Sequence, residues 1–217
     1  MSHLYHLSTP RTGRLVIEGD PDTEVQQLWL VFHGYRQLAP NFIRRFAGLI
    51  EPGVVVAAPE GLSRFYVEGV RGKVGASWMT KEDRLREIED QHAWLDRVWA
   101  HLQTLPGEPQ VHLLGFSQGV ATLWRWLRQR RDLQPDTLTL WAGSIPEEFD
   151  ADMDRRLSRL RLTLAYASHD EFISQEQAEA YLQALRQRYP HLEPLPFDGR
   201  HEVPAEPLAQ LRARLYA

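Results

Sequence analysis

The sequence contains no cysteine among its 217 residues. This absence excludes disulfide bonds, thiolate metal sites and cysteine nucleophiles, and it is typical of proteins in a reducing compartment. No apolar run approaches the ~20 residues of a membrane-spanning helix, and the first residues lack the basic and apolar segments of a secretion signal. We therefore expect a cytoplasmic protein with no integral membrane association.

An excess of positive charge is also absent. The formal net charge is −4 at pH 7, whereas nucleic acids and anionic membranes are bound by clustered lysine and arginine. No nucleic-acid partner is expected. With 43% hydrophobic residues, a chain of this length can bury about 70 to 75% of its unfolded surface, which favours a single domain over residues 1–217.

Short apolar runs bounded by turn residues are typical of parallel strands that are buried on both faces. There are five: Leu28 to His33, Gly53 to Pro59, Val111 to Phe116, Thr137 to Gly143 and Leu160 to Ser168. Two further runs suit edge strands, at Arg14 to Gly19 and Leu192 to Phe197. The second contains two prolines, which a central strand does not tolerate.

Helical patterns alternate with these strands. One runs from Lys81 to Leu105, a second contains Val120, Leu123, Trp124 and Leu127, and a third contains Ala178, Leu182 and Leu185. The alternation predicts an α/β fold with a mostly parallel central sheet and helices on both faces. Only 16 residues separate Gly143 from Leu160, which leaves no room for a cap domain.

Residues 115–119 read Gly-Phe-Ser-Gln-Gly and lie at a predicted strand-to-helix junction. Ser117 is either a nucleophile on a strained turn or a small residue in an ordinary connection. The flanking glycines favour the nucleophile, because such a turn leaves little space for a Cβ on either side. The amide of Gln118, at the start of the helix, then faces a developing oxyanion.

A serine nucleophile requires a base and an acid. Asp170 and His201 each follow a predicted strand, and the order Ser117, Asp170, His201 is the one expected on such a sheet. Alternative acids are Glu147 and Asp150. The alternative base is His169, which as the neighbour of Asp170 is poorly placed to bond it and also reach the serine.

The sequence His33-Gly34 ends the first predicted central strand and indicates the other half of an oxyanion hole. The amide of Tyr35 is the expected second donor, with that of Arg36 as the alternative. His33 itself is expected to be a packed structural histidine. No pair of histidines has the spacing of a metal site, so no metal is expected.

The stretch from Glu60 to Thr80 is longer than ordinary α/β connections of ~2 to 6 residues. Its aromatic residues favour an ordered flap, and the acyl pocket is expected to draw on this flap and on the acid loop. The candidates are Phe65, Tyr66, Trp78, Met79, Phe172 and Ile173. The alternative is that several of them only pack the loop onto the sheet.

Two further features leave alternatives open. Arg36, Arg64 and Arg200 either surround the mouth of the site and favour an anionic substrate, or are solvated. Trp126 lies off the apolar stripe of its helix, so it is either partly exposed or in contact with a second subunit. A homodimer therefore remains open.

Four motifs together resemble the α/β-hydrolase superfamily: "HGY" at 33–35, "GFSQG" at 115–119, "SHDEFIS" at 168–174 and "GRHEVP" at 199–204. Within it they are similar to the capless phospholipase/carboxylesterase group, which includes acyl-protein thioesterases. The resemblance implies hydrolysis of carboxylic esters or thioesters without a cofactor. The acid and histidine loops depart from the usual pattern, with Ser174 where the group has proline and Arg200 where it has glycine.

We therefore expect a serine esterase with a Ser-His-Asp triad that acts through an acyl-enzyme on small or medium acyl esters, thioesters being a second class. Its partner would be a small-molecule ester or thioester substrate. The alternatives are a lysophospholipase or acyl-protein thioesterase with a long apolar channel, and a non-catalytic ligand-binding protein on the same fold.

Overall fold

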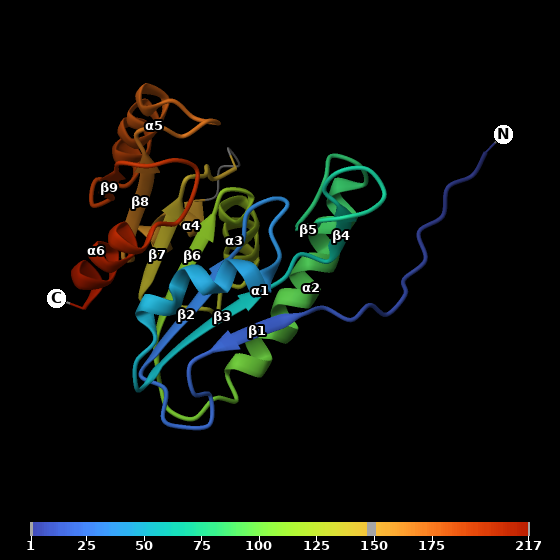
Figure 1. Ribbon diagram of the computed structural model, residues 1–217, viewed down its shortest axis with the longest axis horizontal. Coiled ribbons are helices and arrows are strands. Elements are labelled where there is room, and N and C mark those ends of the chain that lie inside the picture. The colour runs from blue at the N-terminus through green and yellow to red at the C-terminus, as the bar shows by residue number, and fades with distance from the viewer. Residues whose placement is uncertain (1, 147–150, 217) are drawn as a thin grey trace.

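The computed structural model describes residues 2–146 and 151–216, and its centre is a twisted sheet (Figure 1). The sheet strands are β1 (Leu15–Glu18), β2 (Gln27–Phe32), β3 (Val54–Pro59), β6 (Gln110–Phe116), β7 (Thr137–Trp141), β8 (Arg161–Ala167) and β9 (Glu193–Phe197). Their spatial order is β1-β3-β2-β6-β7-β8-β9. Only the β1–β3 pairing in this sheet is antiparallel.

Helices cover both faces of the sheet, which confirms the predicted α/β architecture. One face packs against α2 (Arg84–Leu102), α3 (Gln118–Gln129), α4 (Ala151–Leu157) and α5 (Gln175–Arg188). The other packs against α1 (Ala39–Phe42), the 3-10 helix η1 (Ile43–Leu49) and α6 (Ala205–Leu215). No helix among the described residues is both long and apolar enough to span a membrane.

The central strands are mostly apolar because both of their faces are buried. In β2, Leu30 and Phe32 join the core on the α2–α3 side, while Trp29 and Val31 join the core beneath η1 and α6. The two predicted edge strands are β1 and β9. Proline has no backbone N–H to donate. Because β9 is an edge strand, the N–H groups missing at Pro194 and Pro196 would be needed only for pairing with a further strand.

The long connection after β3 forms an antiparallel hairpin of β4 (Ser63–Tyr66) and β5 (Val74–Ser77). A bridge between Gln37 and Ala76 fastens this hairpin to the loop after β2. At its root the carboxylate of Glu60, 1% exposed, pairs with Arg14 at 2.7 Å and Arg64 at 3.0 Å. The flap is thus ordered by backbone pairing and by a buried ion-pair cluster.

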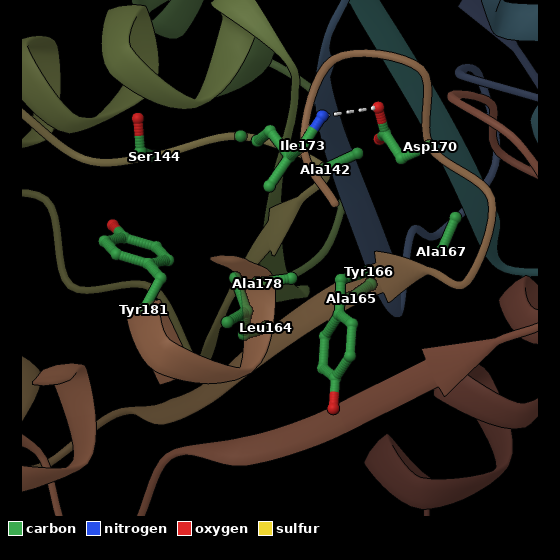
Figure 2. A pocket seen from close by; sticks show the side chains of 11 residues that line it. Ala142, Ser144, Leu164, Ala165, Tyr166, Ala167, Asp170, Ile173, Ala178 and Tyr181 are labelled. Atoms are coloured by element: carbon green, nitrogen blue, oxygen red, sulfur yellow. Dashed lines mark hydrogen bonds between the residues drawn. The ribbon is translucent and has the colours of Figure 1, made fainter. Parts of the chain in front are cut away.

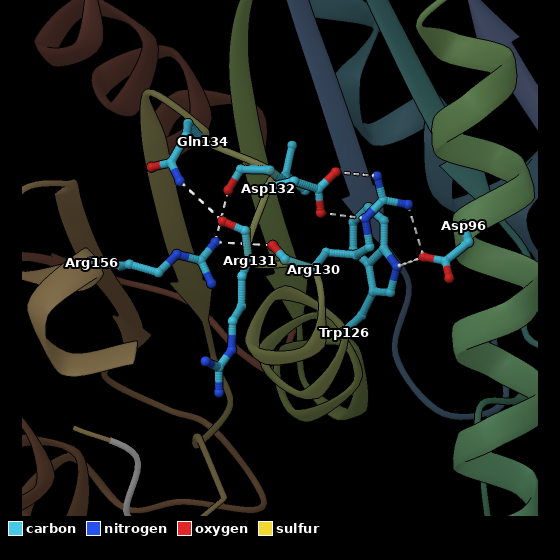
Figure 3. A network of polar contacts seen from close by, with 8 residues as sticks. Asp96, Trp126, Arg130, Arg131, Asp132, Gln134 and Arg156 are labelled. Carbon is cyan, nitrogen blue, oxygen red and sulfur yellow. Dashed lines mark hydrogen bonds and ion pairs between the residues drawn. The ribbon is translucent and has the colours of Figure 1, made fainter. Parts of the chain in front are cut away.

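Trp126 is fully buried, so the expectation of partial exposure or contact with a second subunit is wrong. Its ring packs near Phe32, with ring centroids 6.1 Å apart, and its indole N–H donates to Asp96 at 2.9 Å. Figure 3 shows Arg130 on the same carboxylate, with a separation of 3.2 Å. The indole therefore spans from the sheet to α2, and this residue no longer supports a homodimer.

The end of α3 is closed by an arginine from α4. The Arg156 guanidinium donates to the carbonyl oxygens of Leu127 at 2.8 Å, Arg130 at 3.2 Å and Leu133 at 2.7 Å. Figure 3 shows Arg156 beside Arg130. Leu127 lies in the last turn of α3, where carbonyl groups lack partners within the helix, and Arg130 and Leu133 lie in the loop that follows. The hydrogen bonds from Arg156 fix the C-terminal end of α3, the helix that directly follows Ser117.

His112 is a buried histidine on β6 that has no place in the predicted site. It stacks on Trp29, its Nδ1 accepts from the Thr137 hydroxyl at 2.9 Å, and its Nε2–H donates to the Gln27 side-chain oxygen. Burial lowers the pKa of His112 to about 4, against an opposing effect of Asp136. The folded protein therefore holds this ring neutral.

Stability should consequently fall in mild acid. Unfolded His112 binds a proton below about pH 6.5, but the folded state does so only below about pH 4. Between these values the unfolded state holds more protons, so the stability present above pH 6.5 is lost as the pH falls. The free energy of unfolding should be about 2 kcal/mol lower at pH 5 than at pH 7 from this group alone. Urea unfolding of wild type and His112→Gln at both pH values measures it, and an equal pH dependence in the two proteins would contradict the assignment.

Candidate active site

Ser117 sits on a sharp turn between β6 and α3. Its backbone dihedral angles are φ 54° and ψ −120°, in a region that L-residues rarely adopt. A Cβ on Gly115 would lie 2.6 Å from Val120 Cα, and one on Gly119 would lie 2.3 Å from Phe32 O. The two glycines are therefore required by close packing of the strand and the helix, as the motif predicts, and the half-buried Ser117 lies at the carboxyl end of the sheet.

Asp170 and His201 form a buried hydrogen-bonded pair. The Nδ1–H of His201 donates to Asp170 Oδ2 at 2.7 Å, and the two side chains are 11% and 4% exposed. The other carboxylate oxygen accepts from the backbone N–H groups of Phe172 at 2.8 Å and Ile173 at 3.3 Å. The carboxylate is thus fixed by three donors, and the His201 tautomer it selects leaves Nε2 as an acceptor.

Ring packing holds His201 next to the turn that carries Ser117. Its ring centroid is 4.8 Å from that of Phe116, the residue before the serine, and 4.7 Å from that of Phe172. These contacts bring together the loops after β6, β8 and β9, so the three predicted catalytic residues gather at one end of the sheet. The acid loop and the histidine loop also meet through the His169 N–H, which donates to Gly199 O at 2.9 Å.

The alternative base, His169, does not share this arrangement. The side chain of His169 is 74% exposed and lies 3.4 Å from Asp198, which is itself 90% exposed. His169 therefore points to solvent, away from the Asp170–His201 pair. Glu147 and Asp150 lie outside the described residues. Among the described residues, no cluster of His, Asp and Glu side chains could hold a metal ion.

The loop after β2 lies against Ser117. A Cβ on Gly34 would be 3.2 Å from the Ser117 Cβ and 2.9 Å from the Phe116 ring, so the backbone here needs glycine to come this close. The Arg36 N–H donates to Ala76 O at 2.9 Å. The alternative oxyanion donor is therefore already engaged with the flap, whereas Tyr35 follows directly on the glycine that touches the serine.

His33 is buried and structural, as its position at a strand end predicts. Its Nδ1–H donates to Gly34 O at 2.8 Å, and its Nε2 accepts from the Gly61 N–H at 2.9 Å. Burial lowers the pKa of His33 to about 4, although the bond to Gly34 opposes the shift. A neutral ring therefore ties the loop after β2 to the root of the flap.

Trp78 was expected to line the acyl pocket, but it packs underneath the site. It is 1% exposed, its ring stacks on His33 at 4.7 Å between centroids, and its indole N–H donates to His33 O at 2.8 Å. The large ring fills the space between the flap and the sheet, so burial of apolar area decides its position.

The Gln118 side chain holds the end of the flap, a role that the sequence did not indicate. Its Nε2 donates to Met79 O at 2.8 Å, and its Oε1 accepts from the Trp78 N–H at 3.1 Å. Met79 is half-buried, and its sulfur lies 3.6 Å from the Arg125 guanidinium. Gln118 thus connects the turn of Ser117 to the end of the flap.

The other predicted pocket residues lie at or near the mouth. Phe65 stacks on Tyr35 with centroids 5.3 Å apart, and Tyr66 is 50% exposed. Phe172 is 72% exposed and contacts His201 edge-on. Ile173 lines a cavity of about 80 Å³ together with Asp170.

Three arginines were considered for the mouth of the site. Arg64 is engaged with Glu60, and Arg36 and Arg200 are exposed.

No protein-family model and no curated protein matches the sequence. Solved structures do match. Acyl-protein thioesterase 2 from Zea mays aligns with a TM-score of 0.70 at 17% identity, over 94% of this chain and 98% of that one. Esterase PE8 aligns at 0.65 and 18% identity, over 95% and 99%. A phospholipase/carboxylesterase from Dyadobacter fermentans aligns at 0.63 and 12% identity, over 97% and 99%. The chain has the α/β-hydrolase fold.

Within this α/β-hydrolase fold, the cavity beside Asp170 is the feature that sequence reasoning missed. Its walls come from β7, β8 and α5, and include Leu164, Ala178 and Tyr181. The available signal was the small residues at the carboxyl ends of these strands, Ala142, Ala165 and Ala167 among them. Small residues in a strand do not by themselves distinguish a cavity from close packing of a helix.

Proposed function

We propose that this chain is a serine carboxylic-ester hydrolase that acts through an acyl-enzyme on small or medium acyl esters, with thioesters as a second class. The observation that carries the proposal is the buried Asp170–His201 pair, bonded at 2.7 Å, beside a serine held at φ 54°. A serine in a simple connection has no need of this strain or of an oriented imidazole. The esterase and thioesterase names of the structural neighbours support the same class.

In the first step, Ser117 Oγ attacks the carbonyl carbon of the ester, while His201 Nε2 takes the hydroxyl proton. Asp170 stabilises the resulting imidazolium and keeps the ring in its tautomer. The imidazolium then returns the proton to the departing alcohol or thiol as the carbon–oxygen or carbon–sulfur bond breaks. Ser117 is left as an acyl ester.

The backbone N–H groups of Tyr35 and Gln118 would bind the oxyanion of the tetrahedral intermediate. In a trans peptide the N–H points away from the carbonyl oxygen. The Gly34 carbonyl oxygen is held by His33 Nδ1–H at 2.8 Å and by the Gln37 N–H at 3.2 Å. This fixes the Gly34–Tyr35 peptide, so that its N–H is oriented before the substrate arrives, which is what makes such a donor effective.

In the second step, water attacks the acyl-enzyme with His201 as base, and the acid product leaves as Ser117 recovers its proton. Every proton moves between Ser117, His201, water and the leaving group, so the cycle as proposed runs on the side chains of the chain itself. A thioester would pass through the same intermediates, since only the leaving atom differs.

A fluorophosphonate probe tests the proposal directly. Incubation of the folded protein should add one phosphonyl group, and peptide mapping by mass spectrometry should place it on Ser117. The same protein unfolded in urea should not react, because the serine then lacks its base. An adduct on another serine of the folded protein would refute the assignment, as would an unreacted Ser117 under conditions where esters are hydrolysed.

A further inference from the structure

A cavity of about 80 Å³ lies beneath the acid loop, between the ends of β7 and β8 and helix α5. Its walls are mostly apolar, with Leu164, Ala165 and Ile173 among them. In Figure 2, Asp170 lies at one end of the group, Ser144 and Tyr181 lie at the other, and Ile173, Ala178 and Leu164 lie between them. The cavity thus extends from the acid loop toward α5.

The cavity is adjacent to the nucleophile as well as to the acid. Gly143 lines it, and a Cβ on Gly143 would lie 2.5 Å from the backbone oxygen of Ser117. Asp170, whose carboxylate bonds His201, lines it too. The cavity therefore borders both the backbone of the Ser117 turn and the acid loop.

Two of the polar side chains on the walls, Tyr181 and Asp170, are engaged within the protein, and a third, Ser144, is exposed at the end away from Asp170. The Tyr181 hydroxyl oxygen accepts from the Ile145 N–H at 2.8 Å. The Asp170 oxygens accept from His201 Nδ1–H and from two backbone N–H groups. An ordered water needs two to four polar partners, whereas a cavity with apolar walls favours an apolar guest.

We propose that this cavity receives the acyl chain of the substrate and limits its length. The inference rests on the proposed function, since it needs a carbonyl carbon at Ser117. A cavity of about 150 Å³ accommodates benzene, with its six carbons, so 80 Å³ corresponds to about three carbons beyond the carbonyl. The preferred substrates are then butyryl to pentanoyl esters.

Chain-length profiling of the wild-type protein is the first test. Each methylene that enters the cavity should raise kcat/KM about fourfold, hence about fifteenfold from acetate to butyrate. With p-nitrophenyl esters, kcat/KM should then decline at octanoate and dodecanoate. A value that continues to rise to dodecanoate would overturn the inference and point to the long channel of a lysophospholipase or acyl-protein thioesterase.

Filling the cavity is the second test. In Ala178→Leu the added side chain takes the space of the acyl chain, so the preference for butyrate over acetate should disappear while activity on acetate is retained. Ala180→Leu is the matched control, because it makes the same change at an exposed position of α5. Leu164→Ala enlarges the cavity and should move the optimum of kcat/KM to longer acyl chains. This variant tests the inference even if Ala178→Leu does not fold.

The outcomes separate this inference from the proposed function. A protein that fails to label at Ser117 and does not hydrolyse esters overturns the proposed function. A protein that labels at Ser117, hydrolyses esters and keeps the wild-type butyrate preference in Ala178→Leu overturns the cavity assignment alone. Loss of that preference in Ala178→Leu but not in Ala180→Leu supports it.

Discussion

Replacing Ser117 with alanine should lower kcat for ester hydrolysis by about 10⁶-fold, the order of loss seen when a serine hydrolase loses its nucleophile. In the proposed mechanism no other group can substitute, since Ser117 Oγ forms the bond to the acyl carbon and His201, bonded to Asp170 at 2.7 Å, only takes its proton. The kcat per folded protein, measured with p-nitrophenyl butyrate, checks the value. Ser168→Ala is the matched control: this serine also follows a sheet strand, but its hydroxyl bonds Asp198 at 2.8 Å.

The stability of the Ser117 variants adds a second readout. Alanine keeps the Cβ and therefore the backbone strain at φ 54°. Glycine removes it, and should raise the free energy of unfolding by about 1 kcal/mol relative to alanine. Both variants should be inactive. An alanine variant with nearly full activity, or a Ser168→Ala variant that loses as much, would refute the role of Ser117.

Replacing Asp170 with asparagine should lower kcat by about 10⁴-fold without unfolding the protein. The carboxylate accepts three hydrogen bonds, from His201 Nδ1–H and from the N–H groups of Phe172 and Ile173. Asparagine has a single side-chain oxygen, so it can accept hydrogen bonds at only one of the two carboxylate positions. If its oxygen stays with the loop, its NH₂ group faces His201, which must then carry its proton on Nε2 and can no longer act as a base.

Asp198→Asn is the control for this change. Asp198 is also a loop aspartate near a histidine, His169, but both side chains are largely exposed. Its replacement should leave kcat unchanged, since surface ion pairs of this kind contribute little. Equal losses in Asp170→Asn and Asp198→Asn would show that the acid loop acts only as a structural unit.

His33 illustrates how stability and the proposed chemistry are connected. The ring bonds Gly34 O and the Gly61 N–H and stacks on Trp78, so it joins the loop after β2, the flap root and the flap end. Because its pKa is lowered to about 4 by burial, the connection holds at neutral pH. Acid that protonates this ring would remove the bond from the Gly61 N–H, because Nε2 would then carry a proton and could no longer accept, and so would loosen the flap root from the loop after β2.

Much of the fold follows from local patterns in the sequence. Strand β3 is apolar in every position because both faces are covered, and β6 is apolar apart from His112 and its first residue; that continuity is visible without a structure. The same holds for Gly115, whose Cβ would clash with Val120 in the adjoining helix, whereas Gly119 is required by Phe32 on the neighbouring strand β2. The order of serine, aspartate and histidine follows from strand ends that the patterns already locate.

Contacts between segments far apart in sequence decided the rest. From the sequence, Trp78 was a candidate for the pocket and Trp126 for the surface. Both are buried, because His33 supplies a partner for the indole of Trp78 and Asp96 supplies one for that of Trp126. The choice of Tyr35 over Arg36 depends on Ala76, a flap residue whose carbonyl takes the Arg36 N–H.

The sequence alone therefore determined the sheet, the strained serine and the residue types available for acid and base, since each depends on neighbours in the chain. The tertiary structure alone decided which histidine the acid bonds and where space is left beside it. Hydrogen bonding of His201 to Asp170 spans 31 positions, and the cavity depends on how α5 packs against β8 and the segment after β7. Such packing depends on volumes that no local pattern records.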